Sequence, residues 1–282
     1  MKKKELYIIK YSGESVLFDS NKIRNSLKYS GASKQEIDQI IKVVKSKLFD
    51  GISTKKIYRI VHDQLKKIDR PNAGRYNLKK GIMELGPTGF PFEVFIGELL
   101  KRQGYKVKVG VIVQGDCVQH EVDVVAEKDN EHFIIECKYH SSFSTKCNVK
   151  IPLYIQSRFL DIEKQWLKQS SQNHKFHQGW VVNNTRFTTD AIQYGNCVGL
   201  KLLSWDYPVK ESLKELIGIY GLYPITCLNT LKAREKQLLL NIGIVLCKQL
   251  CNDPDVLKKI GIKPNRGMSI LEDAKALCKS KI

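Results

Sequence analysis

The chain has 282 residues, of which 42% are hydrophobic and 27% are charged. This composition is typical of a folded globular protein and excludes a disordered or fibrous chain. No apolar run approaches the ~18–20 residues that span a bilayer, and the N-terminal residues lack the apolar core of a signal peptide. We therefore expect a cytoplasmic protein with no membrane partner, whose eight scattered cysteines are reduced thiols.

The net charge of +18 is unevenly distributed along the chain. Residues 1–86 contain 20 Lys and Arg against 9 Asp and Glu, residues 87–220 contain 16 against 15, and residues 221–282 contain 11 against 5. A nearly neutral centre between two basic ends is typical of a folded catalytic core with anion-binding flanks. Nucleic acids and nucleotides are the partners that this pattern favours, although a basic surface also serves solubility alone.

Residues 1–86 predict a small domain of two strands followed by four helices. The strands are expected at 6–11 and 15–18, joined by a turn that contains Gly13. Asp19 or Ser20 begins the first helix, and the capping box Ser33-Lys-Gln-Glu36 begins the second. Ser53 or Thr54 begins the third helix, and a fourth is predicted from about 71 to 85.

The segment Gly86-Pro-Thr-Gly89 predicts a domain boundary, and an α/β domain follows it. We expect three domains, at 1–86, 87–224 and 225–282. The fold class is then α/β, in a multidomain α+β chain whose last part is a short helical unit. The elements predicted for the middle domain are a helix at 91–103, strands at 105–113, 120–127 and 132–138, a helix at 152–169, a strand at 179–183, a helix at 188–196 and a strand at 199–204.

Three charged residues interrupt the apolar strands of the middle domain. Asp123 lies among valines, and Glu136 and Lys138 end the segment Phe133-Ile-Ile-Glu-Cys-Lys138. Residues two apart in a strand share a face, and a short turn at 128–130 brings Asp123 onto the neighbouring strand. Carboxylates are the ligands that Mg²⁺ prefers, and a nearby lysine orients water and offsets phosphate charge. The pattern fits metal-assisted phosphodiester hydrolysis.

The alternative for these residues is a solvated strand edge, since such spacing is common by chance. An unpaired charge within a buried strand is costly, which favours a site. Glu93 lies on the apolar face of the preceding predicted helix and is either a boundary residue or a further member of that site.

The segment from Phe92 to Leu100, Gly104-Tyr105, Glu121-Val-Asp123 and Glu136-Cys-Lys138 together resemble the Mrr-like branch of the PD-(D/E)xK restriction-endonuclease superfamily, over roughly residues 87–206. The resemblance implies a DNA endonuclease in which Asp123 and Glu136 bind Mg²⁺ or Mn²⁺, Lys138 serves the nucleophilic water and Glu93 is the helix-borne acid. We expect His140, Gln156 and Arg158 to contact DNA, since Gln156 and Arg158 lie on the helix that follows the strands.

The segments Tyr7–Gly13, Val16–Asp19, Lys22-Ile23, Ile52–Ile57 and Ala73–Tyr76 resemble the ATP-cone, a nucleotide-binding module, over nearly all of residues 5–84. The turn Lys10-Tyr-Ser-Gly13 stands where the family usually has Lys-Arg-Asp-Gly. The resemblance implies that ATP or dATP binds as an allosteric ligand. The expected nucleotide-binding residues are Lys10, Gly13, Lys22, Ile23, Thr54 and Lys80, with a plain basic surface as the alternative reading.

We therefore predict a nucleotide-regulated, Mg-dependent DNA endonuclease that acts in defence against foreign DNA and forms a homo-oligomer, a dimer or a tetramer. The competing hypothesis is a non-catalytic, nucleotide-sensing DNA-binding regulator that uses a nuclease-like scaffold. The helical segment 225–282 either packs within the protein, supports oligomerisation or contacts a DNA backbone through residues 252–262.

Overall fold

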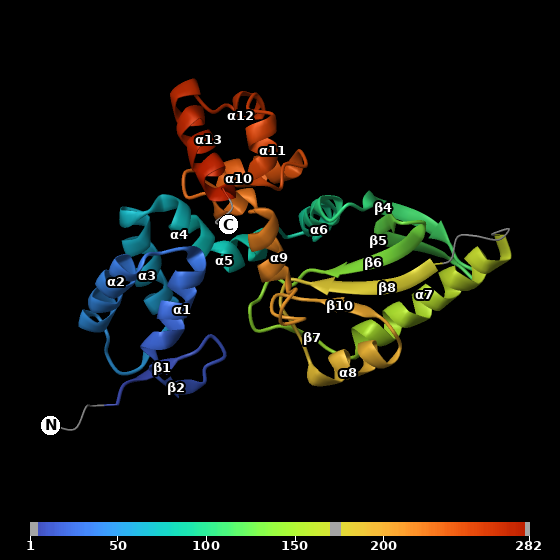
Figure 1. Cartoon of the computed structure of the whole chain (residues 1–282), viewed down its shortest axis with the longest axis horizontal. Coiled ribbons are helices and arrows are strands. Elements are labelled where there is room, and N and C mark those ends of the chain that lie inside the picture. The colour runs from blue at the N-terminus through green and yellow to red at the C-terminus, as the bar shows by residue number, and fades with distance from the viewer. Residues whose placement is uncertain (1–4, 170–175, 280–282) are drawn as a thin grey trace. The chain divides into compact units, whose positions relative to one another are not determined.

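The computed structural model describes residues 5–169 and 176–279, and these form two units (Figure 1). The first unit contains the N-terminal residues up to Gly81 together with Tyr223–Leu239 and the residues from Cys247 onward. The second contains Ile82–Leu222 and Leu240–Leu246. The long segment between Gly81 and Tyr223 thus forms most of a unit of its own.

The first unit combines a small sheet with amphipathic helices. Strand β1 pairs antiparallel with β2 and parallel with β3, a third strand that the sequence did not predict. Asp19 caps the first helix, Ser33 and Glu36 form the expected capping box, and the Ser53 hydroxyl accepts from the Lys56 amide at the start of the third helix. The elements are β1 (Tyr7–Ile9), β2 (Ser15–Leu17), α1 (Ser20–Ser30), α2 (Lys34–Ser46), β3 (Ile52–Ser53), α3 (Thr54–Ile68), α4 (Arg70–Tyr76) and α5 (Leu78–Met83).

The prediction of one helix from 71 to 85 is wrong, because the chain breaks at Asn77 into α4 and α5. Asn77 is buried, and its side-chain Oδ1 accepts a hydrogen bond from the Tyr58 hydroxyl on α3 at 2.6 Å. A contact between residues 19 apart in the chain cannot be predicted from the sequence around Asn77. The core beneath these helices is aliphatic, and its fully buried members include Leu27, Ile40, Val44, Val61 and Leu65.

The C-terminal residues are helical, as predicted, and pack on α4 within the first unit. The Arg75 guanidinium on α4 donates to the carbonyl oxygens of Ala276 at 2.9 Å and of Lys279 at 3.0 Å, which are unsatisfied at the helix end. A Cβ on Gly74 would lie 3.1 Å from Leu277. The elements here are the 3-10 turn η1 (Ile225–Cys227) and helices α10 (Ala233–Asn241), α11 (Cys247–Asn252), α12 (Val256–Lys259) and α13 (Pro264–Cys278).

A five-stranded mixed sheet in the order β10-β8-β6-β5-β4 forms the centre of the second unit. β4, β5 and β6 form an antiparallel meander, while β6, β8 and β10 run parallel. The predicted turn between β5 and β6 has two residues, Asp129 and Asn130, with φ of +52° and +62°, as expected of a tight hairpin. The strands are β4 (Lys106–Gln114), β5 (Gln119–Lys128), β6 (Glu131–Lys138), β8 (Phe176–Asn183) and β10 (Lys201–Leu203), with β7 (Lys146–Cys147) and β9 (Arg186–Phe187) forming a separate parallel pair.

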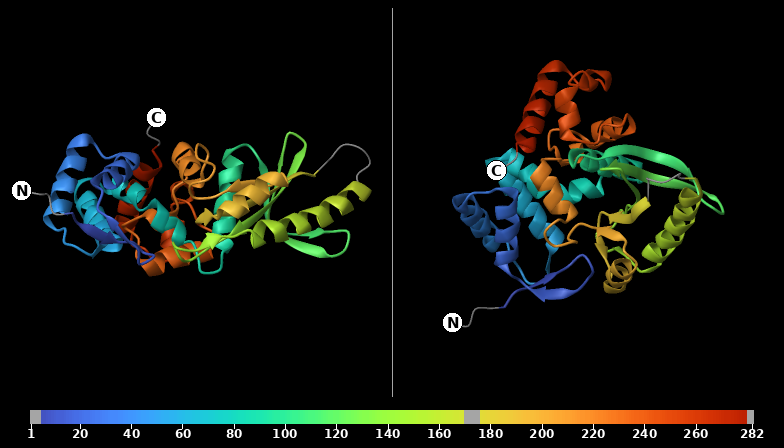
Figure 2. Two further views of the ribbon diagram at one scale, coloured as in Figure 1. Left: turned by 90° about the horizontal axis from the view of Figure 1, so that it is seen from below. Right: turned by 45° about the vertical axis from the view of Figure 1, so that its right-hand side comes forward.

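Helices cover both faces of this sheet (Figures 1 and 2). α6 (Phe90–Arg102) packs on one face, where Gly97 approaches the side chains of Val107 and Val109. α7 (Lys150–Gln169) and α8 (Thr189–Cys197) cover the other face, with Phe159 and Ile162 of α7 packed on Val122 and Ile134. α9 (Leu213–Tyr220) completes the unit. In the part of the chain that the structure describes, no helix is long and apolar enough to cross a membrane.

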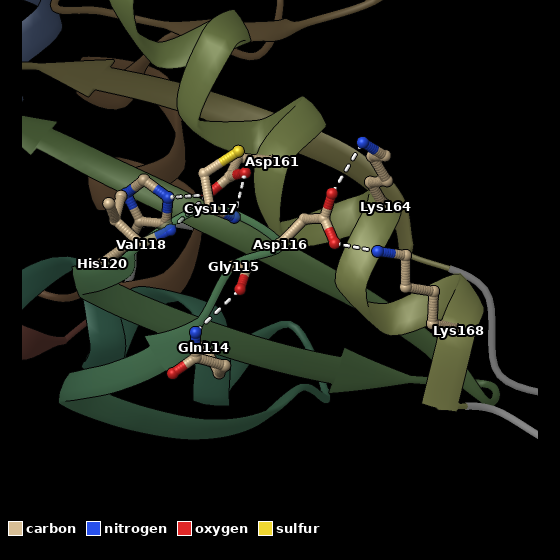
Figure 3. A network of polar contacts seen from close by, with 9 residues as sticks. All are labelled: Gln114, Gly115, Asp116, Cys117, Val118, His120, Asp161, Lys164 and Lys168. Carbon is tan, nitrogen blue, oxygen red and sulfur yellow. Dashed lines mark hydrogen bonds and ion pairs between the residues drawn. The ribbon is translucent and has the colours of Figure 1, made fainter.

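A polar network fastens the β4–β5 loop to α7 (Figure 3). Asp161 pairs with His120 Nε2 at 2.7 Å and accepts from the Cys117 amide at 2.8 Å, and these contacts hold the pKa of its carboxyl below the usual range. Asp116 pairs with Lys164 at 2.6 Å and also with Lys168. A Cβ on Gly115 would lie 2.1 Å from Asp161 Oδ2, so only glycine fits there. The network fixes β5 against the helix that carries Arg158.

Candidate active site

The structure brings Asp123 and Glu136 together at the point where two strands stop pairing. The β5–β6 ladder ends at Val124 and Ile135. One residue further on, the Asp123 carboxylate accepts a hydrogen bond from the Cys137 amide at 2.7 Å, in place of a backbone partner. The local sequence therefore fixes Asp123 beside the Glu-Cys-Lys segment, as the hairpin register predicted.

Two cations hold the Glu136 carboxylate. Its Oε1 accepts from Lys138 Nζ at 2.5 Å, and its Oε2 accepts from Arg158 Nη1 at 2.7 Å. Glu136 is only 5% exposed, so this pairing offsets the cost of burying its charge. The Arg158 guanidinium also donates to the Glu121 carbonyl oxygen and stacks over the Tyr154 ring. Arg158, which we expected to contact DNA, thus binds an acidic residue of the candidate site.

The N-terminal turn of α6 supplies Glu93. Gly89 precedes the helix with φ of +82°, a conformation that favours glycine, and Phe92 and Phe95 anchor the helix in the core. The Tyr139 hydroxyl accepts from the Gly86 amide at 3.0 Å and donates to the Met83 carbonyl oxygen, while a Cβ on Gly86 would clash with its ring. The residue after Lys138 therefore positions the segment that leads to Glu93.

The carboxylates of this site repel one another. Burial, together with the charges of Asp123, Glu136 and Glu121, raises the pKa of Glu93 to about 7. Burial and the charge of Glu136 raise the pKa of Asp123 to about 6, although the Cys137 amide, Lys138 and Arg158 act in the opposite direction. Such perturbed carboxyl groups are typical of functional sites. The arrangement concentrates negative charge that a bound cation would stabilise.

Several buried polar atoms around the site have no hydrogen-bond partner within the described residues. They include His140 Nε2, two residues after Lys138, and Nδ2 of Asn183, the residue that pairs with Lys138 across β6 and β8. Gln156 Oε1 on α7, two residues before Arg158, is also buried without a hydrogen-bond partner in the described residues. Burial and the Lys138 charge lower the pKa of His140. An unsatisfied buried group is costly, so these atoms are available to a ligand.

Sequence reasoning did not identify the Arg158–Glu136 pair or the role of Asp161. The available signal was their spacing, since Arg158 and Asp161 are three apart and share one face of an amphipathic helix. Across residues 5–169 and 176–279, no three His, Cys, Asp or Glu side chains form a group suited to hold a metal ion. In the structure, the Glu136 carboxylate is paired with Lys138 and Arg158.

The predicted nucleotide-binding residues lie on separate elements of the first unit. Lys10 directly follows β1 and pairs with Glu14 at 2.9 Å, and Gly13 lies in the turn with φ of +85°. Lys22 and Ile23 are on α1, where Lys22 is exposed and Ile23 packs on the core. Thr54 begins α3, and Lys80 is exposed on α5. Tyr58, one turn after Thr54, stacks with Tyr76 and His62.

Family models match three parts of the chain. The ATP cone domain matches residues 6–78, the restriction endonuclease model matches 87–153, and the "AF1548-like, C-terminal" model matches 223–278. The first two matches confirm both resemblances found in the sequence. The nuclease match contains Glu93, Asp123, Glu136, Lys138 and His140, but it ends before Gln156 and Arg158.

Individual relatives agree with these matches. An uncharacterized protein of Archaeoglobus fulgidus is 38% identical over 181 residues, which is 64% of this chain and 98% of that protein. The crystal structure of the protein of unknown function AF1548 is 36% identical, with a TM-score of 0.55, and the match covers 66% of this chain and 96% of that one. Can2 from Sulfobacillus thermosulfidooxidans, in complex with cyclic tetra-adenylate, is 15% identical over 73% of this chain and 63% of its own, and its TM-score of 0.34 is too low to bear on fold or function. The chain therefore belongs to the AF1548-like family, with an N-terminal ATP cone domain followed by a restriction endonuclease domain.

Proposed function

We propose that this protein is a nucleotide-regulated, metal-dependent endonuclease that hydrolyses phosphodiester bonds of DNA. The observation that carries the proposal is the meeting of Asp123, Glu136 and Lys138 on adjacent strands, with Glu93 beside them from α6. The role of the protein would be defence against foreign DNA in the cytoplasm, and the resemblance to ATP-cone proteins, which act through oligomeric assembly, implies a dimer or tetramer.

The donor set fits a hard divalent cation such as Mg²⁺ or Mn²⁺. Asp123 Oδ1 and both oxygens of Glu93 accept no hydrogen bond from any described residue, and burial, together with the neighbouring carboxylates, raises the pKa of both groups. Asp123 and Glu136 would hold the cation once Glu136 exchanges one of its two ion pairs. When bound, the cation polarises the scissile phosphate and lowers the pKa of water.

The side chains of the chain supply the remaining chemistry. Lys138 lies beside Glu136, where an ammonium orients the attacking water and offsets charge that develops on the phosphate. Glu93 is the helix-borne acid of the site; burial and the neighbouring carboxylates raise the pKa of its carboxyl to about 7 in the metal-free protein, and a bound cation would lower that pKa and favour the carboxylate, which can accept a proton from the water. Arg158 is then a positioning residue that holds Glu136 and becomes available to phosphate when the carboxylate turns to the cation.

Nucleotide regulation rests on the ATP cone domain. Its turn at Gly13 lets the backbone approach a phosphate, and Lys10, Lys22 and Lys80 supply positive charge. No Gly-x-x-x-x-Gly-Lys-Ser/Thr segment occurs in the chain, so we propose that ATP or dATP is sensed rather than hydrolysed. Regulation requires that nucleotide bind one oligomeric or conformational state more tightly than another.

The second candidate function is a non-catalytic, nucleotide-sensing DNA-binding regulator. The observation that favours it is the complete pairing of Glu136 by Lys138 and Arg158, which satisfies the buried carboxylate without any metal. In that case a divalent cation has no reason to bind.

Plasmid cleavage tests the two candidates. Wild-type protein should convert supercoiled DNA to nicked or linear forms with Mg²⁺ and not with EDTA. Lys138→Ala should lose this activity by about two orders of magnitude or more, the usual cost of removing an electrostatic catalyst, and exposed Lys108→Ala on β4 serves as the matched control. Absence of cleavage by wild type with Mg²⁺ or Mn²⁺, with ATP, dATP or neither, would favour the regulator.

A further inference from the structure

A strongly basic groove runs along α3 in the first unit, and none of the residues predicted to bind nucleotide lines it. Its volume is about 960 Å³. Six of its cations lie on α3 or directly after it, and Lys47 joins them from the end of α2. The six are Lys55, Lys56, Arg59, Lys66, Lys67 and Arg70.

These cations are not neutralised by the protein. All seven are exposed, and none forms an ion pair with any carboxylate of the described residues. Asp63, the acidic residue that lines the groove, lies 3.7 Å from His62, and Lys56 lies over the Phe49 ring. Like charges held together repel one another and destabilise the fold. A polyanion in the groove would remove that repulsion.

The shape of the groove favours a chain of phosphates over one nucleotide. α3 has 15 residues and is therefore about 22 Å long at 1.5 Å per residue, so its five cations form a long row that Arg70 at the start of α4 continues. Ile60 is the one apolar residue among those that line the groove, against seven lysines and arginines. Thr54 and Tyr58 are four residues apart on another face of α3, away from the line of Lys55, Arg59 and Lys66. The groove is therefore distinct from the predicted nucleotide site.

We propose that this groove binds the phosphate backbone of duplex DNA without reading its sequence. The choice of DNA rests on the proposed endonuclease function, whose substrate it would hold through a second contact on the same chain. Regularly spaced phosphates complement a row of unpaired cations, and each contact releases condensed counterions. A site of this kind lets the ATP cone domain control how tightly DNA is held as well as whether it is cut.

Binding of a fluorescent 30-base-pair duplex to the full chain in EDTA, at several salt concentrations, tests the proposal. The groove variant is Lys55→Ala/Arg59→Ala/Lys66→Ala. Its matched control, Lys28→Ala/Lys34→Ala/Lys42→Ala, removes equal charge from exposed positions on α1 and α2. Loss of three phosphate contacts should lower the slope of log affinity against log salt by about 2.7 and weaken binding more than about tenfold. The control should stay within about threefold of wild type, and circular dichroism verifies that all three proteins fold.

Two results would contradict DNA binding by the groove without contradicting the proposed endonuclease function. One is equal loss of affinity in both triple variants. The other is a groove variant that keeps its duplex affinity but no longer gives heat with ATP in calorimetry, which would assign the groove to nucleotide. Failure of the wild-type protein to bind duplex at low salt would instead contradict the proposed function, and the groove proposal with it.

Discussion

The guanidinium of Arg158 on α7 donates to Glu136 on β6 at 2.7 Å, and so fixes a carboxylate that Lys138 also holds. Both charges of the Arg158–Glu136 pair are largely buried, with side-chain exposures of 15% and 7%. Where a divalent cation binds, it must compete with this arginine. The pair therefore sets both the stability of the metal-free site and its readiness for metal.

Arg158→Ala should destabilise the metal-free protein and make it more responsive to metal. Removing Arg158 leaves the buried Glu136 carboxylate without one of its two cations. Because Lys138 remains, we expect the free energy of unfolding to fall by about 3 kcal/mol, the lower end of the range for breaking a buried ion pair. Mg²⁺ or Mn²⁺ should restore more stability to the variant than to wild type. Thermal denaturation with and without metal measures both effects. An equal rise in melting temperature on adding metal to the two proteins would contradict competition between Arg158 and the cation for Glu136.

The stability of the metal-free protein should carry a pH-dependent contribution from Glu93. Its raised pKa of about 7 means that the folded state keeps a proton that the unfolded chain releases near pH 4–5. This stabilisation is complete below that range and is lost as pH rises through 7. The lowered pKa values of His62 and His140 act with the opposite sign, so the measurement is a difference between proteins.

The melting temperature of wild type minus that of Glu93→Gln, measured in EDTA from pH 5 to 8, should fall as pH rises. Wild type minus Asp123→Asn should show the same trend at lower pH, with the fall complete at about pH 6 because the pKa of this carboxyl is raised only to about 6. A difference in melting temperature that does not change with pH over this range would contradict the raised pKa values of Glu93 and Asp123.

Gly115→Ala should destabilise the second unit through the network that joins the β4–β5 loop to α7. The new methyl group would lie 2.1 Å from Asp161 Oδ2 and 2.6 Å from the Val118 carbonyl oxygen, so the loop must move away from the helix. Overpacking of this kind costs about 1–3 kcal/mol. Val118→Ala, which trims an exposed side chain in the same loop, is the control, and chemical denaturation that fails to separate the two variants would contradict the role of the network.

Lys22→Ala should abolish the response to nucleotide without unfolding the protein. Lys22 is exposed on the first turn of α1, so its loss removes charge and no core packing. Wild type should bind ATP or dATP without turnover and change its oligomer distribution, as measured by calorimetry and light scattering. No heat with either nucleotide at millimolar concentration would contradict the regulatory function, and Lys28→Ala on the same helix controls for charge.

Local signals predicted most of this fold. The turn Asp129-Asn130, the capping box at Ser33 and the alternation of Asp123 with valines each depend on neighbouring residues, and the structure has all three. The same alternation placed Glu136 and Lys138 on one face, where their side chains meet.

Contacts between distant residues account for what the sequence did not predict. Asn77, where the helix breaks, is hydrogen-bonded to Tyr58, and Arg158 pairs with a carboxylate 22 residues away. The basic groove requires α3 to expose one face while Ile57, Val61 and Leu65 bury another, and a count of charges along the chain does not reveal that geometry. The packing of α13 on Arg75 is of the same kind.

The most direct test of the central claim is single-turnover cleavage of duplex DNA by excess protein with Mg²⁺, for wild type and Asp123→Asn, with DNA binding measured in parallel. Asparagine keeps the size of the side chain and an oxygen for the Cys137 amide, but it removes the charge that would hold a cation. The account predicts cleavage by wild type, loss of cleavage by at least about 100-fold in Asp123→Asn, and similar DNA affinity for both. Cleavage by Asp123→Asn at the wild-type rate would contradict it.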